Sequence, residues 1–199
     1  MGSQTKVAGV ILAGGRARRM NNQDKGLVNF KGRPMASYAI TALTPIADTI
    51  LINANRNIGQ YRQFGYPVIS DQTDSFDGPL AGILSAMIYS DADILLVLPC
   101  DSPLIQSRHL QKLLAACMAD NANAAVAFDG NRSHPVFLAV KTALQHSLQA
   151  YLDSGQRKVA TWLAQQHPVQ VDFSGEPGIF NNVNTPAELS ALEDAYYFS

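Results

Sequence analysis

Residues 7–25 read V-A-G-V-I-L-A-G-G-R-A-R-R-M-N-N-Q-D-K, and this stretch decides the fold. Its first seven residues are almost wholly apolar, include β-branched side chains and show no helical period. Such a run, ended by two glycines, is typical of a strand buried on both faces at the centre of a parallel sheet. Gly14 and Gly15 then allow a sharp turn, in which backbone N–H groups can approach a phosphate without a Cβ in the way.

Positive charge gathers directly around this turn. Residues 6–33 hold seven of the fifteen Lys and Arg residues and a single acid, Asp24, although the net charge of the chain is only −1. A glycine turn followed by local positive charge favours a polyphosphate ligand. The sequence contains neither G-x-G-x-x-G nor a Gly-Lys pair, which excludes the dinucleotide fingerprint and the P-loop. On the glycines alone, a simple turn with a solvated basic loop is the alternative.

Composition limits the classes of protein to consider. A chain of 199 residues with 47% hydrophobic and 16% charged residues has the length and composition of one folded domain. The apolar run at residues 94–100 is far shorter than the roughly 20 residues of a membrane helix. Three arginines follow residues 7–13 and no A-x-A cleavage site appears, so we do not expect this run to be a secretory apolar region. We expect a cytoplasmic protein whose two cysteines, Cys100 and Cys117, are free thiols.

Apolar runs alternate with helical patterns along the chain, which predicts βαβ crossovers and a mostly parallel sheet. The predicted strands are residues 7–13, 49–52, 68–69, 94–98 and 169–173, with a β-hairpin at 124–128 and 135–140. Helices are expected to begin at residues 32–34, to end near 89, to span 107–118, to flank Gly155 and to begin at Pro186. We therefore expect one three-layer, doubly wound, Rossmann-like α/β domain over residues 1–199, with a small β-hairpin.

Polar residues follow several predicted strands, at the edge where open α/β sheets bind ligands. They include Asn53, Asp71 and Asp101. Asp101 is the most informative, because a lone carboxylate after a buried central strand is costly unless it meets a cation. Mg²⁺ commonly takes one or two carboxylates together with substrate phosphates. The alternative for Asp101 is a helix N-cap, since Asp101-Ser102-Pro103 could begin a helical turn.

The pattern L-A-G-G-x-x-x-R-M-x-x-x-D-K at residues 12–25 resembles the signature loop of the nucleotidyltransferases, and more narrowly that of the molybdenum cofactor guanylyltransferases. The resemblance continues along nearly the whole chain. The further similar segments are N-A-N-R at 53–56, G-P-L-A-G at 78–82, P-C-D at 99–101, S-H-P at 133–135, G-Q-R-K-V at 155–159 and N-V-N-T-P at 182–186. One departure is Asn21-Asn22, where this family commonly has glycine after the Arg-Met pair.

The resemblance implies that the protein transfers GMP from GTP to molybdopterin carrying molybdenum, with release of pyrophosphate and with Mg²⁺ as the cofactor. The implied catalytic residues are Lys25, Asp101 and Arg19, with Asp101 as the metal ligand. The implied GTP-binding residues are Leu12, Ala13, Gly14, Gly15, Lys25, Asn53, Asp71, Gly78, Pro79 and Asp101. The implied acceptor-binding residues are Asn182, Asn184 and Arg157, so that the N-terminal half would bind GTP and the C-terminal half the acceptor. Without the resemblance, Asn182 and Asn184 could be mere turn formers.

The chemistry implied by this resemblance needs no nucleophilic side chain. A phosphate monoester has a second pKa of about 6, so an acceptor of this kind is largely dianionic at neutral pH and can attack the α-phosphorus of GTP without a general base. The enzyme then mainly has to position the substrates and neutralise charge. His134 is expected to form structural hydrogen bonds, and Trp162 to pack in the core.

The expected partners are GTP, the molybdopterin cofactor, and proteins that donate or accept that cofactor. We expect a monomer that does not bind membranes. Nucleic-acid binding is not expected either, because the sequence pI is about 6.4 and no stripe of stacking aromatics is present. Two alternatives stay open. One is a cytidylyl- or sugar-phosphate nucleotidyltransferase of the same superfamily, and the other is a non-catalytic nucleotide-binding regulator.

Overall fold

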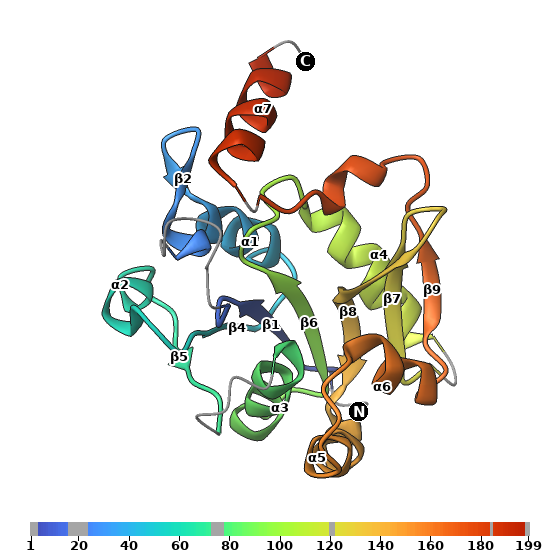
Figure 1. Ribbon diagram of the computed structural model, residues 1–199. Coiled ribbons are helices and arrows are strands. Elements are labelled where there is room, and N and C mark those ends of the chain that lie inside the picture. The colour runs from blue at the N-terminus through green and yellow to red at the C-terminus, as the bar shows by residue number, and fades with distance from the viewer. Residues whose placement is uncertain (1–3, 16–23, 73–77, 120–121, 184, 198–199) are drawn as a thin grey trace.

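The computed structural model describes residues 4–15, 24–72, 78–119, 122–183 and 185–197. A seven-stranded sheet forms the centre of the molecule, in the order β5-β4-β1-β6-β8-β7-β9 (Figure 1). Its strands are β1 (Val7–Leu12), β4 (Thr49–Asn53), β5 (Val68–Ile69), β6 (Ile94–Pro99), β7 (Ala124–Phe128), β8 (Ser133–Lys141) and β9 (Val169–Asp172). Strand β8 runs antiparallel to its neighbours β6 and β7, while the other pairs are parallel. The mostly parallel sheet is therefore confirmed.

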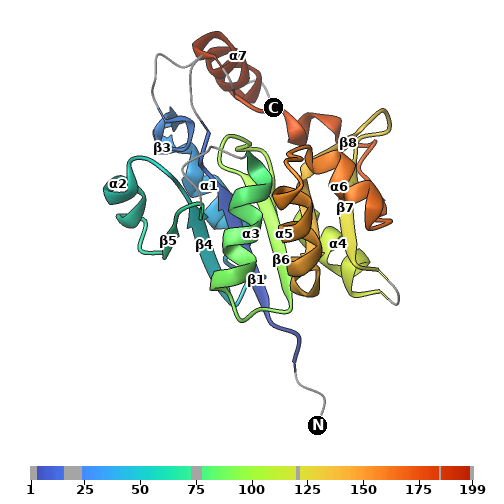
Figure 2. The ribbon, with the colours of Figure 1, turned by 60° about the horizontal axis from the view of Figure 1, so that its bottom comes forward.

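Helices cover both faces of this sheet because side chains alternate along its strands. In β1, Val7 and Ile11 face one core, whereas Ala8 and Val10 face the other. The first core contains residues of α1 (Met35–Leu43), α2 (Ile58–Arg62) and α4 (Ser107–Met118), and the second contains residues of α3 (Pro79–Tyr89), α5 (Gln145–Asp153) and α6 (Val159–Gln165). In Figure 2, α3 and α5 lie in front of the sheet and α1 and α4 behind it. The three-layer, doubly wound architecture is confirmed.

The strand order creates a switch point between β1 and β6. The chain passes from β1 to β4 and β5 on one side, and then returns to place β6 on the other side of β1. Leu12 is in register with Pro99, so the backbone beyond both strands leaves the sheet at neighbouring positions. On the other side of β1, Leu12 is in register with Asn53. Open α/β sheets bind ligands at such a point, beyond the carboxyl ends of the strands.

The predicted hairpin at 124–128 and 135–140 is confirmed as strands β7 and β8, which pair antiparallel within the main sheet. Two other details of the fold differ from the sequence-based prediction. A separate hairpin, β2 (Asn29–Phe30) and β3 (Arg33–Pro34), was not predicted. Its turn is made by Lys31 and Gly32, both with positive φ, a conformation that favours tight hairpins. Pro34 therefore ends β3 and precedes α1, and does not lie in the first turn of that helix.

The last helix, α7 (Pro186–Tyr197), begins where the sequence predicts, and the Glu188 N–H donates to Thr185 Oγ1 at 3.2 Å. It stands apart from the main sheet at the top of Figure 1, beside the β2–β3 hairpin. Leu189 and Leu192 pack there against a small cluster that includes Phe30. The remaining short 3₁₀ segments are η1 (Lys25–Leu27), η2 (Thr142–Leu144) and η3 (Pro177–Phe180).

The interior matches several smaller expectations. Trp162 is fully buried in the core, as predicted. Cys100 and Cys117 are both buried and free. Burial raises the pKa of the Cys117 thiol to about 11 and also raises the pKa of Cys100, so both stay protonated near neutral pH. Within the described ranges, the helices are too short or too polar to span a bilayer.

Candidate active site

The ends of β1 and β6 bring Lys25 and Asp101 together. Lys25 begins η1, and its Nζ donates to Asp101 Oδ2 at 2.8 Å. Asp101 is only 6% exposed, and its Oδ1 is buried without a hydrogen-bond partner. A buried carboxylate oxygen without a donor is costly unless a cation or another ligand contacts it. The geometry therefore fits a cation bound by the carboxylate of Asp101.

The alternative role of Asp101, as a helix N-cap, is wrong for the helix that follows. Helix α4 begins at Ser107, and its N-cap is Gln106. Asp101 lies instead in the turn that directly follows β6. Its carboxylate accepts the hydrogen bond from Lys25. Asp101 is buried because it follows a central strand of the sheet.

A second polar cluster lies at the carboxyl ends of β4 and β5, on the other side of β1 from Asp101. Asn53 Nδ2 donates to Asp71 Oδ1 at 2.9 Å, and Asn55 Nδ2 donates to Asp71 Oδ2 at 2.7 Å. The backbone N–H of Asp71 donates in return to Asn55 Oδ1 at 2.9 Å. The structure thus joins Asn53 and Asp71, as the sequence suggests, and adds Asn55. The spacing of two residues between the asparagines, which places both on one side of an extended chain, is the signal that could have found it.

Glycines allow this cluster to sit tightly against β1 and α3. A Cβ at Gly82, in the second turn of α3, would lie 2.3 Å from Asn53 Oδ1. A Cβ at Gly14 would lie 3.1 Å from Asn55 Nδ2. Gly78, with a φ of +77°, is the N-cap of α3, and Pro79 is its first residue. The segment G-P-L-A-G therefore begins a helix and also leaves space for the amide of Asn53.

The two residues that precede the glycine turn are held by neighbouring strands. The Ala13 N–H donates to the Asn53 carbonyl at 2.8 Å, and the Leu12 carbonyl accepts from the Cys100 N–H at 3.1 Å. Ala13 is buried and Leu12 packs against the core beside α3. The backbone that leads to Gly14 and Gly15 is consequently held on both sides by the sheet.

The expected acceptor residues are placed differently from one another. Ser102 Oγ donates to Asn182 Oδ1 at 2.6 Å, and the Val183 N–H donates to the Asp101 carbonyl at 3.0 Å, so Asn182 lies beside the Asp101 turn. Arg157 lies in the loop between α5 and α6, where its Nη1 donates to the carbonyls of Leu152 and Gln156. These two bonds are local to the end of α5. The other expected residues, Arg19, Asn21, Asn22 and Asn184, lie outside the described residues.

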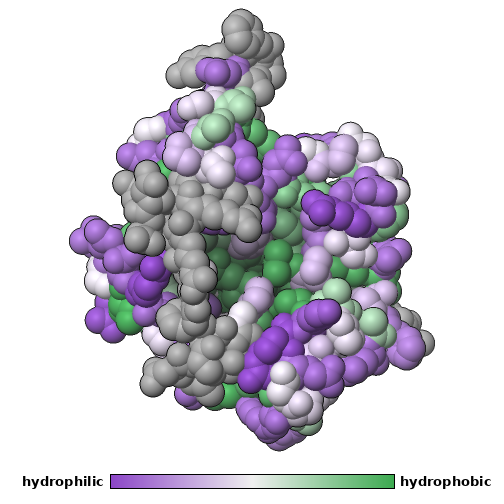
Figure 3. Space-filling view, viewed as in Figure 1, coloured by the Kyte–Doolittle hydropathy of each residue, from purple (hydrophilic) through white to green (hydrophobic). Residues whose placement is uncertain are grey.

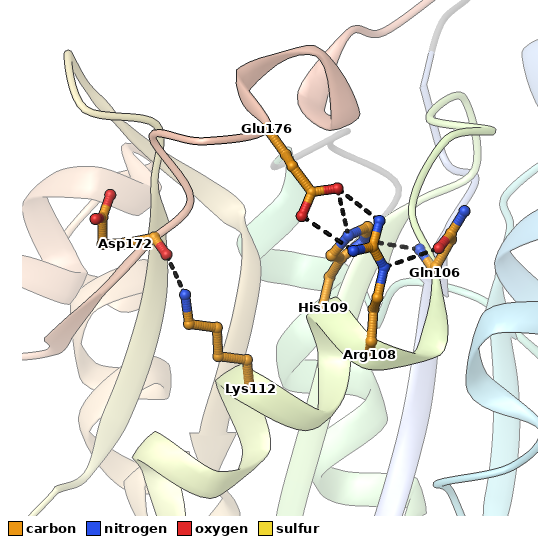
Figure 4. Close-up of polar contacts among 6 residues, drawn as sticks. All are labelled: Gln106, Arg108, His109, Lys112, Asp172 and Glu176. Atoms are coloured by element: carbon orange, nitrogen blue, oxygen red, sulfur yellow. Dashed lines mark hydrogen bonds and ion pairs between the residues drawn. The ribbon is translucent and has the colours of Figure 1, made fainter. Parts of the chain in front are cut away.

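The segment of residues 173–183, here called the strap, leads from β9 to Asn182 and is fastened to α4 (Figure 4). Arg108 donates to both carboxylate oxygens of Glu176, at 3.1 and 2.5 Å. Lys112, one turn further along α4, donates to the backbone carbonyl of Asp172, the last residue of β9 directly before the strap. The strap is thus held on α4 by side chains that lie on the surface of the molecule.

A buried histidine lies under this fastening. His109 is 3% exposed, and its Nδ1 accepts a hydrogen bond from the Gln106 N–H at 3.0 Å. The neutral ring therefore carries its proton on Nε2, which lies 3.5 Å from Glu176 Oε2. Burial lowers the pKa of His109, with the nearby Arg108 acting in the same direction. The ring is consequently neutral near pH 7.

His134, in β8, has the structural role that the sequence suggests. Its Nε2 lies 2.7 Å from Asp129 Oδ2, and its ring stacks on Phe180 with centroids 4.2 Å apart. The Arg132 N–H, the His134 ring and the Asn131 N–H together lower the pKa of Asp129. His134 therefore stabilises the β7–β8 turn.

The face that contains these groups is hollowed. Seen from the side of Figure 1, the surface has a hollow near its centre with hydrophobic residues on its floor (Figure 3). Among the described residues, groups of three or more His, Cys, Asp or Glu that could enclose a metal ion are absent. A metal at this site would therefore depend on ligands from a substrate as well as on Asp101.

Comparisons with known proteins agree with this architecture. The model of the MobA-like NTP transferase domain matches residues 9–169. The molybdenum cofactor guanylyltransferase of Shewanella loihica is 50% identical over 190 residues, covering 96% of this chain and 97% of that protein. The one from Shewanella halifaxensis is 48% identical, covering 96% of this chain and 95% of that protein.

Solved structures are similar over nearly the whole fold. The molybdopterin-guanine dinucleotide biosynthesis protein A of Archaeoglobus fulgidus has a TM-score of 0.79 at 20% identity, covering 96% of this chain and 100% of that chain. The 4-diphosphocytidyl-2C-methyl-D-erythritol synthase of Anaerococcus prevotii has a TM-score of 0.76 at 10% identity, covering 98% and 97%. At these identities the likeness concerns the fold. The family follows from the sequence relatives: the chain belongs to the molybdenum cofactor guanylyltransferases, which are nucleotidyltransferases of the MobA-like type.

Proposed function

We propose that this protein transfers GMP from GTP to molybdopterin carrying molybdenum. The acceptor phosphate forms a bond to the α-phosphorus of GTP, and the bond between that phosphorus and the β-phosphate oxygen breaks, which releases pyrophosphate. The observation that carries the proposal is the pair of Lys25 and Asp101 at the switch point. It combines a cation with a buried carboxylate that keeps one oxygen without a hydrogen-bond partner, directly after the central strand β6.

The N-terminal half of the chain would bind GTP. Residues 12–15 would approach the nucleotide with their backbone, and Lys25 would contact phosphate oxygens as a point charge. Asn53 and Asp71 would hold the guanosine part, with Gly78 and Pro79 shaping the base pocket. A carboxylate has about four acceptor sites, so Asp71 can accept from two asparagine amides and still accept from the N–H donors of guanine. A site of this kind rejects a base whose edge leaves those groups unpaired.

The Oδ1 of Asp101 is buried without a hydrogen-bond partner, which supports Mg²⁺ as the cofactor. Asp101 would hold the ion together with phosphate oxygens, and the ion would supply positive charge where negative charge develops on the transferring phosphoryl group. Lys25, bonded to Asp101 Oδ2, would keep the carboxylate oriented with Oδ1 toward the ligand. Arg19 would add a further cation on the nucleotide side.

The C-terminal half would bind the acceptor. Asn182 is supported by its bond to Ser102, which holds it beside the Asp101 turn. Asn184 and Arg157 are proposed from their sequence motifs. Because the acceptor phosphate is largely dianionic at neutral pH, these residues need to orient it and do not need to remove a proton.

The reaction itself is the test. Purified protein would be incubated with Mg²⁺, molybdenum-loaded molybdopterin and either GTP or CTP, and pyrophosphate and the dinucleotide product would be measured. We expect turnover with GTP and almost none with CTP. Comparable turnover with CTP would favour the cytidylyl alternative, and GTP binding without pyrophosphate would favour the regulator. A cytoplasmic monomer that exchanges cofactor with donor and acceptor proteins stays a prediction, which gel filtration and cofactor-transfer assays would check.

A further inference from the structure

One short segment outside the signature loop holds both ends of that loop. The segment comprises residues 56–61, which follow β4 and include the first four residues of α2. At the start of the loop, Arg56 Nη2 donates to the Gly15 carbonyl at 2.8 Å. At its end, Tyr61 OH donates to Asp24 Oδ1 at 2.5 Å and Asn57 Nδ2 donates to Asp24 Oδ2 at 3.3 Å. Three side chains from one segment therefore contact both ends.

The contacts at Asp24 are buried. Tyr61 is fully buried and Asp24 is only 6% exposed. Burial and the charge of Asp24 raise the pKa of the Tyr61 phenol, so its hydroxyl remains a donor at every physiological pH. A Cβ at Gly26 would lie 2.5 Å from the Tyr61 hydroxyl, and only a glycine there lets the phenol reach Asp24. A buried carboxylate with two side-chain donors is expensive to disturb.

Asp24 and Lys25 are neighbours whose side chains contact different parts of the fold. Asp24 contacts the 56–61 segment, whereas Lys25 reaches Asp101 across 76 positions of sequence. The Asp24 carbonyl accepts from the Leu27 N–H at 3.0 Å, which closes the first turn of η1. Holding the carboxylate of Asp24 thus holds the backbone from which Lys25 extends.

We propose that Arg56, Asn57 and Tyr61 form a clamp that fixes Lys25 against Asp101 and the phosphates of the nucleotide. They are positioning residues, since they act through Gly15 and Asp24 and not on the substrate. The inference rests on the proposed function, in which Lys25 contacts GTP. It assigns to the N-A-N-R segment and to α2 a role in the phosphate site in addition to the role of Asn53 in the base site.

A double-mutant cycle tests the clamp in the full-length protein. Tyr61→Phe, Lys25→Ala and the double variant would be compared by calorimetry of GTP with Mg²⁺ and by kcat/KM for GTP and for the acceptor. We expect Tyr61→Phe alone to lower kcat/KM for GTP about tenfold, with KM for the acceptor unchanged. In the Lys25→Ala background the same change should have almost no further effect, because contacting residues that act as a unit are not additive.

Two further variants keep the test independent of folding. Asn57 has a φ of +51°, so Asn57→Gly keeps the backbone conformation and removes only the amide that contacts Asp24. It should weaken GTP binding in the same direction as Tyr61→Phe. Thr142→Val is the matched control, since it removes a hydroxyl that donates to the Ala92 carbonyl at the amino edge of the sheet. Its GTP affinity should equal that of the wild type.

The outcomes distinguish a failure of the clamp proposal from a failure of the proposed function. A full additional tenfold loss from Tyr61→Phe in the Lys25→Ala background would overturn the clamp, as would wild-type GTP affinity and turnover in both Tyr61→Phe and Asn57→Gly. If the wild type binds GTP but transfers nothing to the acceptor, the proposed function is wrong. In that case a weaker GTP affinity in Tyr61→Phe, abolished in the Lys25→Ala background, would still support the clamp.

Discussion

The proposed phosphate side, which comprises Asp24, Lys25, Asn53 and Asp101, and the strap are held by different kinds of contact. Around the ends of β1, β4 and β6, the polar partners are buried, and Asp24, Asn53 and Asp101 are each 6% exposed or less. On the strap, the side chains of Arg108 and Glu176 are 58% and 43% exposed. Removing one partner of a buried pair leaves a desolvated group behind, whereas an exposed ion pair is screened by water. The phosphate side is therefore preorganised by buried polar contacts. The strap is anchored by the buried side chains of Phe173, Ile179, Phe180 and Val183, and its exposed pair with Arg108 adds little.

This difference matches the demands of the proposed reaction. Groups that neutralise charge in a phosphoryl transfer act best when they are fixed before the substrate arrives. The strap has another task, because it carries Asn182 to the Asp101 turn. Substitutions on the phosphate side should consequently have large effects on GTP and catalysis, and substitutions on the strap small effects confined to the acceptor.

The largest expected effect is that of Asp101→Asn. The substitution keeps the shape of the side chain and removes the charge that would hold Mg²⁺, so kcat should fall about 100-fold or more, the scale seen when one electrostatic contact to a transition state is lost. Turnover would be measured across a Mg²⁺ titration, with thermal melts as a folding control. Wild-type turnover with an unchanged Mg²⁺ requirement would show that the metal assignment is wrong.

Two glycine-to-alanine substitutions, one beside Asn53 and one on the strap, test the difference between the two regions. In Gly82→Ala the new Cβ would lie 2.3 Å from Asn53 Oδ1 and push the amide away from its position, so GTP affinity should fall about tenfold, as for the loss of about 1.4 kcal/mol of binding free energy. Gly175→Ala, on the strap, meets nothing within 4 Å and should bind GTP like the wild type. Calorimetry compares the two variants. Equal GTP affinities would contradict the role of Asn53 in the base site.

The buried histidine beneath the strap predicts a pH dependence of stability. The pKa of His109 is lowered in the folded state, so the unfolded chain binds more protons than the folded chain as the pH falls through about 6.5. The free energy of unfolding should therefore decrease between pH 7.5 and 5.5, and it should decrease less in His109→Asn, which keeps an acceptor for the Gln106 N–H. Urea unfolding at several pH values measures this slope. Identical slopes in both proteins would mean that His109 contributes nothing to it.

The smallest effect is expected for Glu176→Gln, which weakens the pairing with Arg108. We expect KM for the acceptor to rise about twofold and the GTP affinity to stay constant, because exposed pairs contribute little. Asp91→Asn is the control, since the pair of Lys6 and Asp91 is even more exposed and lies far from the strap. Steady-state kinetics with each substrate varied would decide. A tenfold loss of GTP affinity in Glu176→Gln would contradict the separation of the two regions.

Several residues of the candidate site could be proposed from the sequence because they follow recognisable strands. The apolar runs of β1, β4 and β6 identify a central parallel sheet, and its carboxyl edge identifies Asn53, Asp71 and Asp101. Asn55 was missed, although its spacing from Asn53 was a usable signal. Tyr61 and His109 are common residue types in ordinary local patterns, and their contacts with Asp24 and Glu176 depend on the folded chain. The β2–β3 hairpin was also missed, since Lys31 at a positive φ is an uncommon turn residue.

The sequence by itself determined the layers of this protein and the order of its main elements. Those features follow from apolar periodicity and turn chemistry, which act between residues a few positions apart. The tertiary structure alone decided which polar groups meet. The contacts of Lys25 with Asp101, Tyr61 with Asp24 and Arg108 with Glu176 span 76, 37 and 68 positions. Their formation depends on strand order and helix packing, because these set the distances between side chains that are remote in sequence.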